Sequence, residues 1–188
     1  MTSETALIAA AKRGSVRAYT ELVSVYRGGL LRFLVTRTPS FADAEDALQD
    51  TLINAYRYIN SYDAKWRFST WLYRIAINNL SRISAAEPGN KVQVGQIDKL
   101  SDEEAGPLEL CIAADDRQNL WLSAKRVLND EVFTAMWLRY VEDMSVNDIS
   151  AVLERSISWT KVNLLRARKQ LDTDLNSTPA KKASKAYG

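Results

Sequence analysis

The sequence predicts an all-α protein built of two small helical domains that are joined by a flexible acidic linker. Apolar residues recur at the three- and four-residue spacing of amphipathic helices in two separate stretches of the chain. The stretch between them, residues 85–117, has no sustained apolar period, contains Pro88-Gly89 and Gly106-Pro107, and is rich in acids. Charge is segregated as well, because residues 155–188 carry eight Lys or Arg against two acids. A basic end of this kind indicates a polyanionic partner.

These patterns also predict the domain boundaries. The first domain is expected over residues 1–84, the linker over 85–117 and the second domain over 118–175. Residues 176–188, rich in Lys, Ala, Ser and Thr, form a predicted disordered basic tail. The acids of the linker repel one another, which favours an extended, flexible connection.

The composition narrows the function classes. The chain of 188 residues has no histidine and a single cysteine, Cys111, so it lacks the commonest general base and metal ligand and cannot form an internal disulfide. We therefore predict a protein that is not an enzyme and uses no metal or other cofactor. No apolar run approaches the roughly 20 residues that cross a bilayer, and the N-terminus lacks the features of a signal peptide. The expected location is the cytoplasm, with no insertion of the protein itself into a membrane.

Two helices are predicted at the start of the chain. The first covers residues 3–13, and Gly14 ends it, as glycine commonly does just past a helix C-terminus. The second covers residues 15–37 and has apolar residues at helical spacing. Gly28-Gly29 lies inside this pattern, at a cost of about 1 kcal/mol per glycine relative to alanine.

A third helix, predicted over residues 40–58, carries an acidic ridge. Ser40 and Asp43 have the spacing of a capping box, and acids in a first turn are favoured by the helix dipole. The dipole does not explain Asp50, which continues the ridge at three- and four-residue spacing. We interpret the ridge as a docking surface for a basic partner. Its residues are Asp43, Glu45, Asp46, Gln49, Asp50 and Asn54.

Residues 62–82 combine a polar, aromatic loop with a fourth helix. Ser69 is expected to cap this helix. Its predicted inner face consists of Leu72, Ile75, Ala76 and Leu80. Cations hold phosphates, aromatic faces stack on unpaired bases and asparagine can pair with a base edge, so the segment suits a DNA strand that has been opened. An amphipathic helix with an ordinary solvated basic face is the alternative interpretation. The candidate DNA contacts are Tyr62, Lys65, Trp66, Arg67, Phe68, Trp71, Arg74, Asn78 and Arg82.

The second domain is predicted to end in a helix-turn-helix. Two helices over residues 118–140 precede a short helix over 145–153, a three-residue turn and a longer basic helix that is capped by Ser156 or Ser158. In this motif the second helix enters the major groove with its N-terminal residues toward the bases. A plain helical bundle with a solvated basic face is the alternative. The candidate DNA-facing residues are Ser158, Trp159, Lys161, Val162, Asn163 and Arg166.

Together, these segments resemble the extracytoplasmic-function sigma factors of bacterial RNA polymerase. Residues 43–50, DAEDALQD, match the DAED-x-x-Q-[ED] signature of the family, and residues 68–78, FSTWLYRIAIN, match its F-x-T-W-L-Y-R-I-A-x-N stretch. Residues 149–168 are similar to its C-terminal helix-turn-helix, and residues 166–169 to its closing R-A-R-K. The resemblance covers nearly the whole chain except the linker and the tail.

The resemblance implies a sigma factor that binds core RNA polymerase and directs promoter-specific transcription initiation. The family grips the clamp helices of the largest polymerase subunit with the acidic ridge. It holds a flipped minus-ten base with a loop like residues 62–68 and an asparagine at the place of Asn78, melts the DNA, and reads the minus-thirty-five element with the helix-turn-helix. The implied partners are core RNA polymerase, promoter DNA and an anti-sigma factor, either soluble or anchored in the membrane.

The chain departs from the family pattern in the helix-turn-helix. Glu154 stands where the turn usually has glycine, and Arg155 where it has an apolar residue. Trp159-Thr160 replaces a Thr-Val pair, and Asn163 replaces a common basic residue. The first change bears on the geometry of the turn, and the others on the usual minus-thirty-five preference.

Two other function classes remain compatible with the sequence. A sigma-like decoy would titrate an anti-sigma factor without touching DNA, but such a protein is expected to lose the basic and aromatic groups of residues 61–84, which this chain keeps. A helix-turn-helix repressor would bind closed duplex as a dimer. That function leaves the acidic ridge unexplained, and the sequence has no dimerisation heptad.

Overall fold

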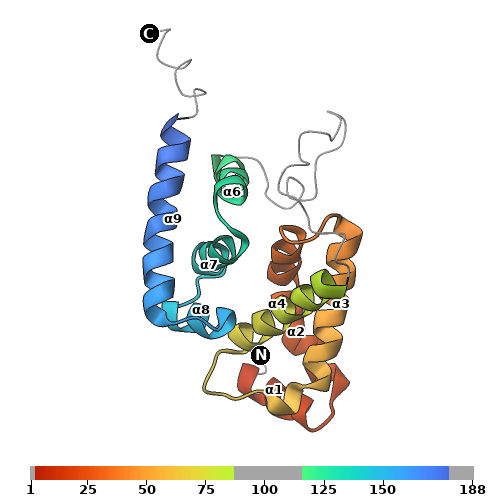
Figure 1. Cartoon of the computed structure of the whole chain (residues 1–188). Helices are drawn as coiled ribbons and strands as arrows, with labels where there is room; N and C mark the ends of the chain where they lie inside the picture. Colours follow the sequence, from red (N-terminus) through yellow and green to blue (C-terminus); the bar gives the residue numbers. More distant parts are fainter. Residues whose placement is uncertain (1–2, 87–115, 178–188) are drawn as a thin grey trace, which may run out of the picture. The chain divides into compact units, whose positions relative to one another are not determined.

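The computed structural model describes residues 3–86 and 116–177 of the chain. The chain divides into two compact units, Met1–Cys111 and Ile112–Gly188, and each is described below by itself. All secondary structure in the described residues is helical (Figure 1), which confirms the predicted all-α class. Most of the predicted tail and most of the predicted linker lie outside these residues, so the domain boundaries stay predictions. None of the described helices is long and apolar enough to span a bilayer.

The N-terminal unit is a helical bundle in which the first three helices start at serine caps. Its elements are α1 (Glu4–Lys12), α2 (Val16–Val35), α3 (Phe41–Arg57), the 3-10 helix η1 (Ile59–Ser61) and α4 (Phe68–Ala86). Ser3, Ser15 and Ser40 each accept a hydrogen bond from the backbone N–H three residues further on. Gly14 follows α1 with a φ of 93°, a conformation that glycine adopts without strain. The helix α2 continues through Gly28-Gly29, as the sequence predicts.

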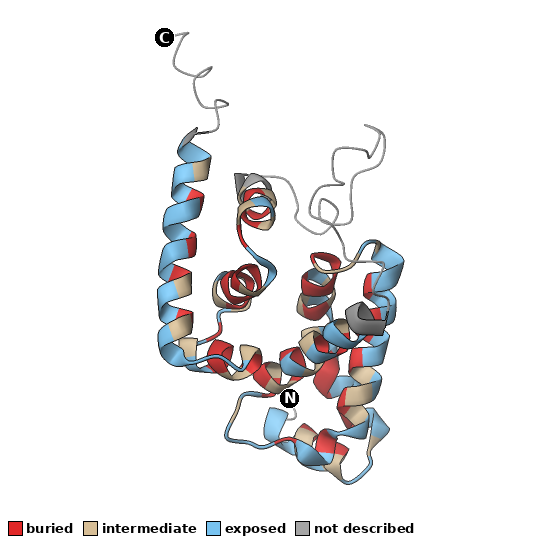
Figure 2. Ribbon diagram, viewed as in Figure 1, coloured by how far each residue is buried: buried red, intermediate tan, exposed pale blue. Residues whose placement is uncertain are grey.

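The core of the N-terminal unit lies between α2, α3 and α4. The helix α2 packs against α1 and α3, and α3 packs against α4. Phe33 and Tyr73 are both buried, and their ring centroids lie 5.4 Å apart. Figure 2 shows the buried residues on the faces that neighbouring helices of the unit turn toward one another.

The helix α4 starts two residues earlier than the predicted cap at Ser69 implies. The helix begins at Phe68, and the N–H of Trp71 donates to the carbonyl of Arg67 at 3.3 Å, so Ser69 lies inside the first turn and is not the cap. Leu72 and Ala76 are buried as predicted. The other two predicted inner residues, Ile75 and Leu80, are only half-buried.

The C-terminal unit packs its last helix against the other three. Its elements are α6 (Asp116–Val127), α7 (Asp130–Tyr140), α8 (Val146–Leu153) and α9 (Ile157–Ser177). The ring of Trp121 lies 5.0 Å from Trp137 and 5.8 Å from Phe133, centroid to centroid, and forms an aromatic core between α6 and α7. Ser145 caps α8 as predicted.

The turn between α8 and α9 has the left-handed conformation that glycine favours, although Glu154 occupies the position. Glu154 adopts the left-handed conformation, with φ 54° and ψ 38°, which strains a residue with a Cβ by about 1 kcal/mol. The hydroxyl groups of Ser150 and Thr160 lie 2.9 Å apart in the interior and join the two helices. Of the two candidate caps for α9, Ser156 is the correct one, because its side chain accepts from the N–H of Trp159 at 3.1 Å.

Candidate functional site

The acidic ridge of α3 faces solvent. Its exposed members are Asp43, Glu45, Asp46, Gln49 and Asp50. The opposite face of the helix is buried through Ala44, Ala47 and Leu48, so packing fixes the ridge outward. Asp43 also serves the helix start, because its carboxylate accepts from the hydroxyl of Ser40 at 2.7 Å. The remaining carboxylates form a continuous negative surface, which suits a basic partner.

Asn54 does not belong to the exposed ridge. It is half-buried, and its amide donates to the side-chain oxygen of Asn79 at 3.1 Å. The amide of Asn79 in turn donates to the hydroxyl of Thr51 at 3.4 Å. These bonds tie α3 to α4. The sequence groups Asn79 with Asn78 as a polar side chain of this segment and does not predict its burial, although Asn79 continues the buried positions Leu72 and Ala76 at helical spacing.

The loop before α4 is closed by its own hydrogen bonds. The hydroxyl of Tyr62 donates to the carbonyl of Trp66 at 2.6 Å. Asp63 accepts from the N–H of Lys65 through its side chain, at 2.9 Å, and from the N–H of Trp66 through its carbonyl, at 3.1 Å. The loop therefore has a defined shape, and Asp63, its one acid, is needed for that shape.

Two of the predicted base-stacking residues are part of the core. Tyr62 and Phe68 have exposed fractions of 7% and 0%. Their rings contact each other and Trp71, with all three centroid distances at 5.5 Å. In this structure neither Tyr62 nor Phe68 can offer a face to a base. The interpretation of both as stacking residues is therefore corrected: they form an aromatic floor beneath the loop. Burial and the charge of Glu4 raise the pKa of the Tyr62 hydroxyl.

The other predicted contacts of the loop and α4 are exposed or half-buried. Lys65, Arg67, Arg74, Asn78 and Arg82 are exposed, and Trp66 and Trp71 are half-buried. On the helix, Trp71, Arg74, Asn78 and Arg82 follow one another at three- and four-residue spacing, which aligns them in a stripe along one face. In the loop, the amine of Lys65 lies 5.6 Å from the Trp66 ring centroid. On α4, two cations, a partly exposed indole and a carboxamide thus share one face of the helix.

The N-terminal part of α9 presents most of its predicted residues to solvent. Ser158, Lys161, Val162 and Arg166 are exposed, and Trp159 and Asn163 are half-buried. The amide of Asn163 donates to the carbonyl of Trp159 at 2.9 Å. The buried Leu164 and Ala167 hold the opposite face of α9 against the core, so the predicted face points outward.

Arg155, just before α9, contacts both α7 and the first turn of α9. The sequence did not predict these contacts. The guanidinium of Arg155 donates to both carboxylate oxygens of Glu131 on α7, with 3.0 Å between Nη2 and Oε2. The hydrogen bond with Glu131 raises the pKa of Arg155. The same guanidinium lies 5.5 Å from the ring centroid of Trp159, a cation–π arrangement. The unusual residues at 155 and 159 thus contact each other.

Comparisons with known proteins match this arrangement. The family descriptions "Sigma-70 region 2" and "Sigma-70, region 4" fit residues 22–83 and 119–171. The chain is 26% identical over 183 residues to the ECF RNA polymerase sigma-E factor of Haemophilus influenzae, covering 92% of this chain and 95% of that protein. It is 27% identical to the ECF RNA polymerase sigma factor SigW of Bacillus subtilis, covering 87% and 92%. The chain belongs to the extracytoplasmic-function sigma factors. The segments that match the two regions contain the residues of all three predicted surfaces of this sigma factor.

Solved structures share the fold. CnrH in complex with the cytosolic domain of CnrY has a TM-score of 0.68 and 24% identity, covering 92% of this sigma factor and 96% of that chain. RpoE of Bartonella quintana, in complex with the anti-sigma factor NepR, has a TM-score of 0.66 and 22% identity, covering 87% and 99%. Within the described residues of this sigma factor, no cluster of three or more His, Cys, Asp or Glu could hold a metal ion.

Proposed function

We propose that this sigma factor divides promoter-specific initiation among three surfaces. The exposed ridge of α3 binds core RNA polymerase, the loop over residues 62–67 and the outer stripe of α4 hold an opened minus-ten strand, and the N-terminal part of α9 contacts the minus-thirty-five element. The observation that carries the proposal is the stripe from Trp71 to Arg82 beside a closed loop, since it combines phosphate-binding, stacking and base-pairing groups on one surface.

The minus-ten assignment rests on the two kinds of side chain along the stripe. Arg74 and Arg82 flank Asn78 by one turn on each side, so a backbone held by the arginines brings a base within reach of the carboxamide. Trp66 and Trp71 provide the partly exposed aromatic faces, and the buried rings of Tyr62 and Phe68 contact the ring of Trp71. Splaying one base out of a stack costs a few kcal/mol, which stacking at about 1–3 kcal/mol per base offsets.

The minus-thirty-five assignment rests on exposure and charge in α9. Lys161 and Arg166 are exposed on the outward face and supply phosphate contacts, and Val162 supplies an apolar contact for a thymine methyl group. Trp159 and Asn163 adjoin them. Because Trp159 and Asn163 replace residues that are usual in the family, we propose that this sigma factor prefers an unusual minus-thirty-five sequence.

An anti-sigma factor is the proposed regulator. CnrH and RpoE were solved with partners, one of them an anti-sigma factor and the other the cytosolic domain of a second protein. Both share the fold of this chain. The partner here is either soluble or anchored in the membrane, and the sigma factor works in the cytoplasm, without a catalytic activity of its own.

A reconstituted transcription assay tests the proposed function. Purified sigma factor is added to core RNA polymerase and a library of genomic promoters, and initiation at a small set of promoters is expected. The decoy alternative predicts no initiation at any promoter. The matched control is core polymerase with the Asn78→Ala variant, which is expected to retain polymerase binding but to lose most initiation.

A further inference from the structure

The helix α1 lies outside the segment that matches sigma region 2, which starts at residue 22, yet it contacts the minus-ten loop. The amine of Lys12 donates to the backbone carbonyl of Tyr62 at 2.7 Å. The same amine lies 5.5 Å from the centroid of the Tyr62 ring. Lys12 is half-buried, so this contact is shielded in part from water, which strengthens it. One side chain of α1 thus fixes the residue at which the loop begins.

The other end of α1 reaches the same aromatic floor through a second contact. The hydroxyl of Tyr26 on α2 donates to the carboxylate of Glu4. The ring of Tyr26 contacts Phe68, with 5.6 Å between the centroids. The charge of Glu4 also contributes to the raised pKa of Tyr62. Both ends of α1 therefore act on the cluster of Tyr62 and Phe68.

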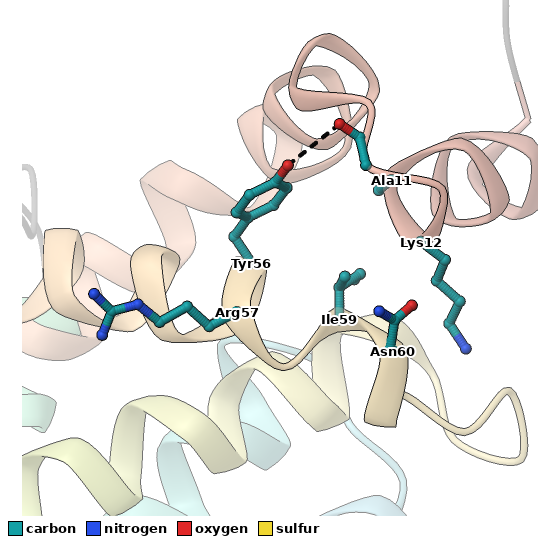
Figure 3. Close-up of a pocket in the computed structure, with 7 residues that line it drawn as sticks. Ala11, Lys12, Tyr56, Arg57, Ile59 and Asn60 are labelled. Carbon is teal, nitrogen blue, oxygen red and sulfur yellow. Dashed lines mark hydrogen bonds between the residues drawn. The ribbon is translucent and has the colours of Figure 1, made fainter.

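The C-terminal end of α1 borders a pocket of the N-terminal unit. Only Leu7 and Ala11 of the helix are buried. A pocket of about 260 Å³ lies beside Ala11 and Lys12, and α3 and η1 complete its wall (Figure 3). The hydroxyl of Tyr56 spans from α3 to the carbonyl of Gly14 at 3.3 Å, a long hydrogen bond. The buried Ala11 packs this end of α1 into the unit, and the hydrogen bond of Lys12 joins the same end directly to the loop.

We infer that Lys12 is a positioning residue for minus-ten recognition. By holding the carbonyl of Tyr62, it fixes the start of the loop, and the Tyr62 hydroxyl transmits that position to Trp66 across the loop. The inference rests on the proposed function, because it assumes that the loop and Asn78 face the opened strand. The inference gives α1 a role in minus-ten recognition, although α1 does not itself need to contact the DNA.

The test uses the full-length sigma factor with core polymerase and two single-stranded minus-ten oligonucleotides, the preferred sequence and one with its flipped base replaced. Lys12→Met removes the donor and keeps the apolar stem. It is expected to reduce the affinity ratio of the two oligonucleotides by about three- to tenfold, the effect of one hydrogen bond, with unchanged polymerase affinity. Lys12→Arg should restore part of the ratio. Arg13→Met, which removes the same charge from the adjacent exposed position, is the control and should change nothing.

Salt dependence separates positioning from direct phosphate binding. If Lys12 only positions the loop, Lys12→Met leaves the dependence of log affinity on log salt unchanged. A slope reduced by about 0.7, as expected for one lost phosphate contact on a single strand, with an unchanged affinity ratio would overturn the inference. So would a fall in melting temperature with no change in the ratio. If the unaltered protein fails to distinguish the two oligonucleotides, the proposed function itself fails, which is a different result from failure of the Lys12 variants.

Discussion

Adjacent asparagines on α4 have opposite environments. Asn78 is exposed in the stripe of candidate DNA contacts, whereas Asn79 is buried and bonded to Asn54 and Thr51 of α3. A helix turns by about 100° per residue, so neighbours in sequence face different surroundings. One asparagine is available for a base, and the other holds two helices together.

Substitution of the two asparagines should separate stability from recognition. Asn79→Ala leaves Asn54 and Thr51 without their amide partner and is expected to lower the free energy of unfolding by about 1–3 kcal/mol. Asn78→Ala should change it by less than about 0.5 kcal/mol, because the side chain is exposed. Denaturant unfolding followed by circular dichroism measures both. Equal destabilisation by the two variants would contradict the assignment.

Glu154 stores backbone strain in the helix-turn-helix. Glu154→Gly should raise the free energy of unfolding of the C-terminal unit by about 0.5–1 kcal/mol, because glycine adopts the positive φ without a Cβ penalty. Glu154→Ala is the matched control, since it removes the carboxylate but keeps the Cβ, and it should not stabilise the unit. A gain of equal size in both variants would assign the effect to the carboxylate instead of the backbone.

At the scale of the element, α3 combines a buried face that packs with α4 and an exposed face that carries charge. The double charge reversal Asp46→Arg and Asp50→Arg alters only the exposed face. We expect it to weaken binding to core polymerase by at least about tenfold, since like charges then face a basic partner. Affinity for the single-stranded minus-ten oligonucleotide, measured without polymerase, should persist. Glu21→Arg, an exposed reversal on α2, is the control.

The helix α9 makes a corresponding prediction for duplex DNA. If Lys161 holds a phosphate, Lys161→Ala should lower the slope of log affinity against log salt by about one unit, with little change in sequence preference. Val162→Ala, at the next exposed position, should leave the slope unchanged. Fluorescence anisotropy with a minus-thirty-five duplex over a range of salt concentrations measures both. An unchanged slope for Lys161→Ala would make Lys161 a base contact or a bystander.

At the scale of the whole molecule, local signals predict most of the helices. Ser40 with Asp43, Ser145 and Gly14 all mark helix ends where the sequence places them, because capping depends on residues within one turn. Ser69 fails as a cap, because α4 already begins at the buried Phe68, two residues before the start that a Ser69 cap implies. The packing of the folded chain decides helix boundaries of this kind, and a local sequence pattern carries no information about that packing.

The sequence predicted which segments carry the candidate surfaces. It did not predict the buried contacts that hold these segments in place. The aromatic pattern of residues 62–68 identifies the segment but not which rings are buried, because that depends on contacts with Tyr26 on α2. Lys12 lies 50 residues from Tyr62 in sequence, and Glu131 lies 24 residues from Arg155. Such long-range pairs leave no periodicity in the chain, so only the structure brings them together.

The most direct test of the central proposal is selection from a labelled single-stranded minus-ten library by the sigma factor with core polymerase, compared with its Asn78→Ala variant. We expect the unaltered protein to enrich a short motif. The variant should bind polymerase with unchanged affinity but lose that enrichment. A failure of the unaltered protein to enrich any motif, with or without polymerase, would contradict the proposal and favour a decoy that titrates an anti-sigma factor. Enrichment of the same motif by the variant would retain a sigma factor but remove Asn78 from minus-ten recognition.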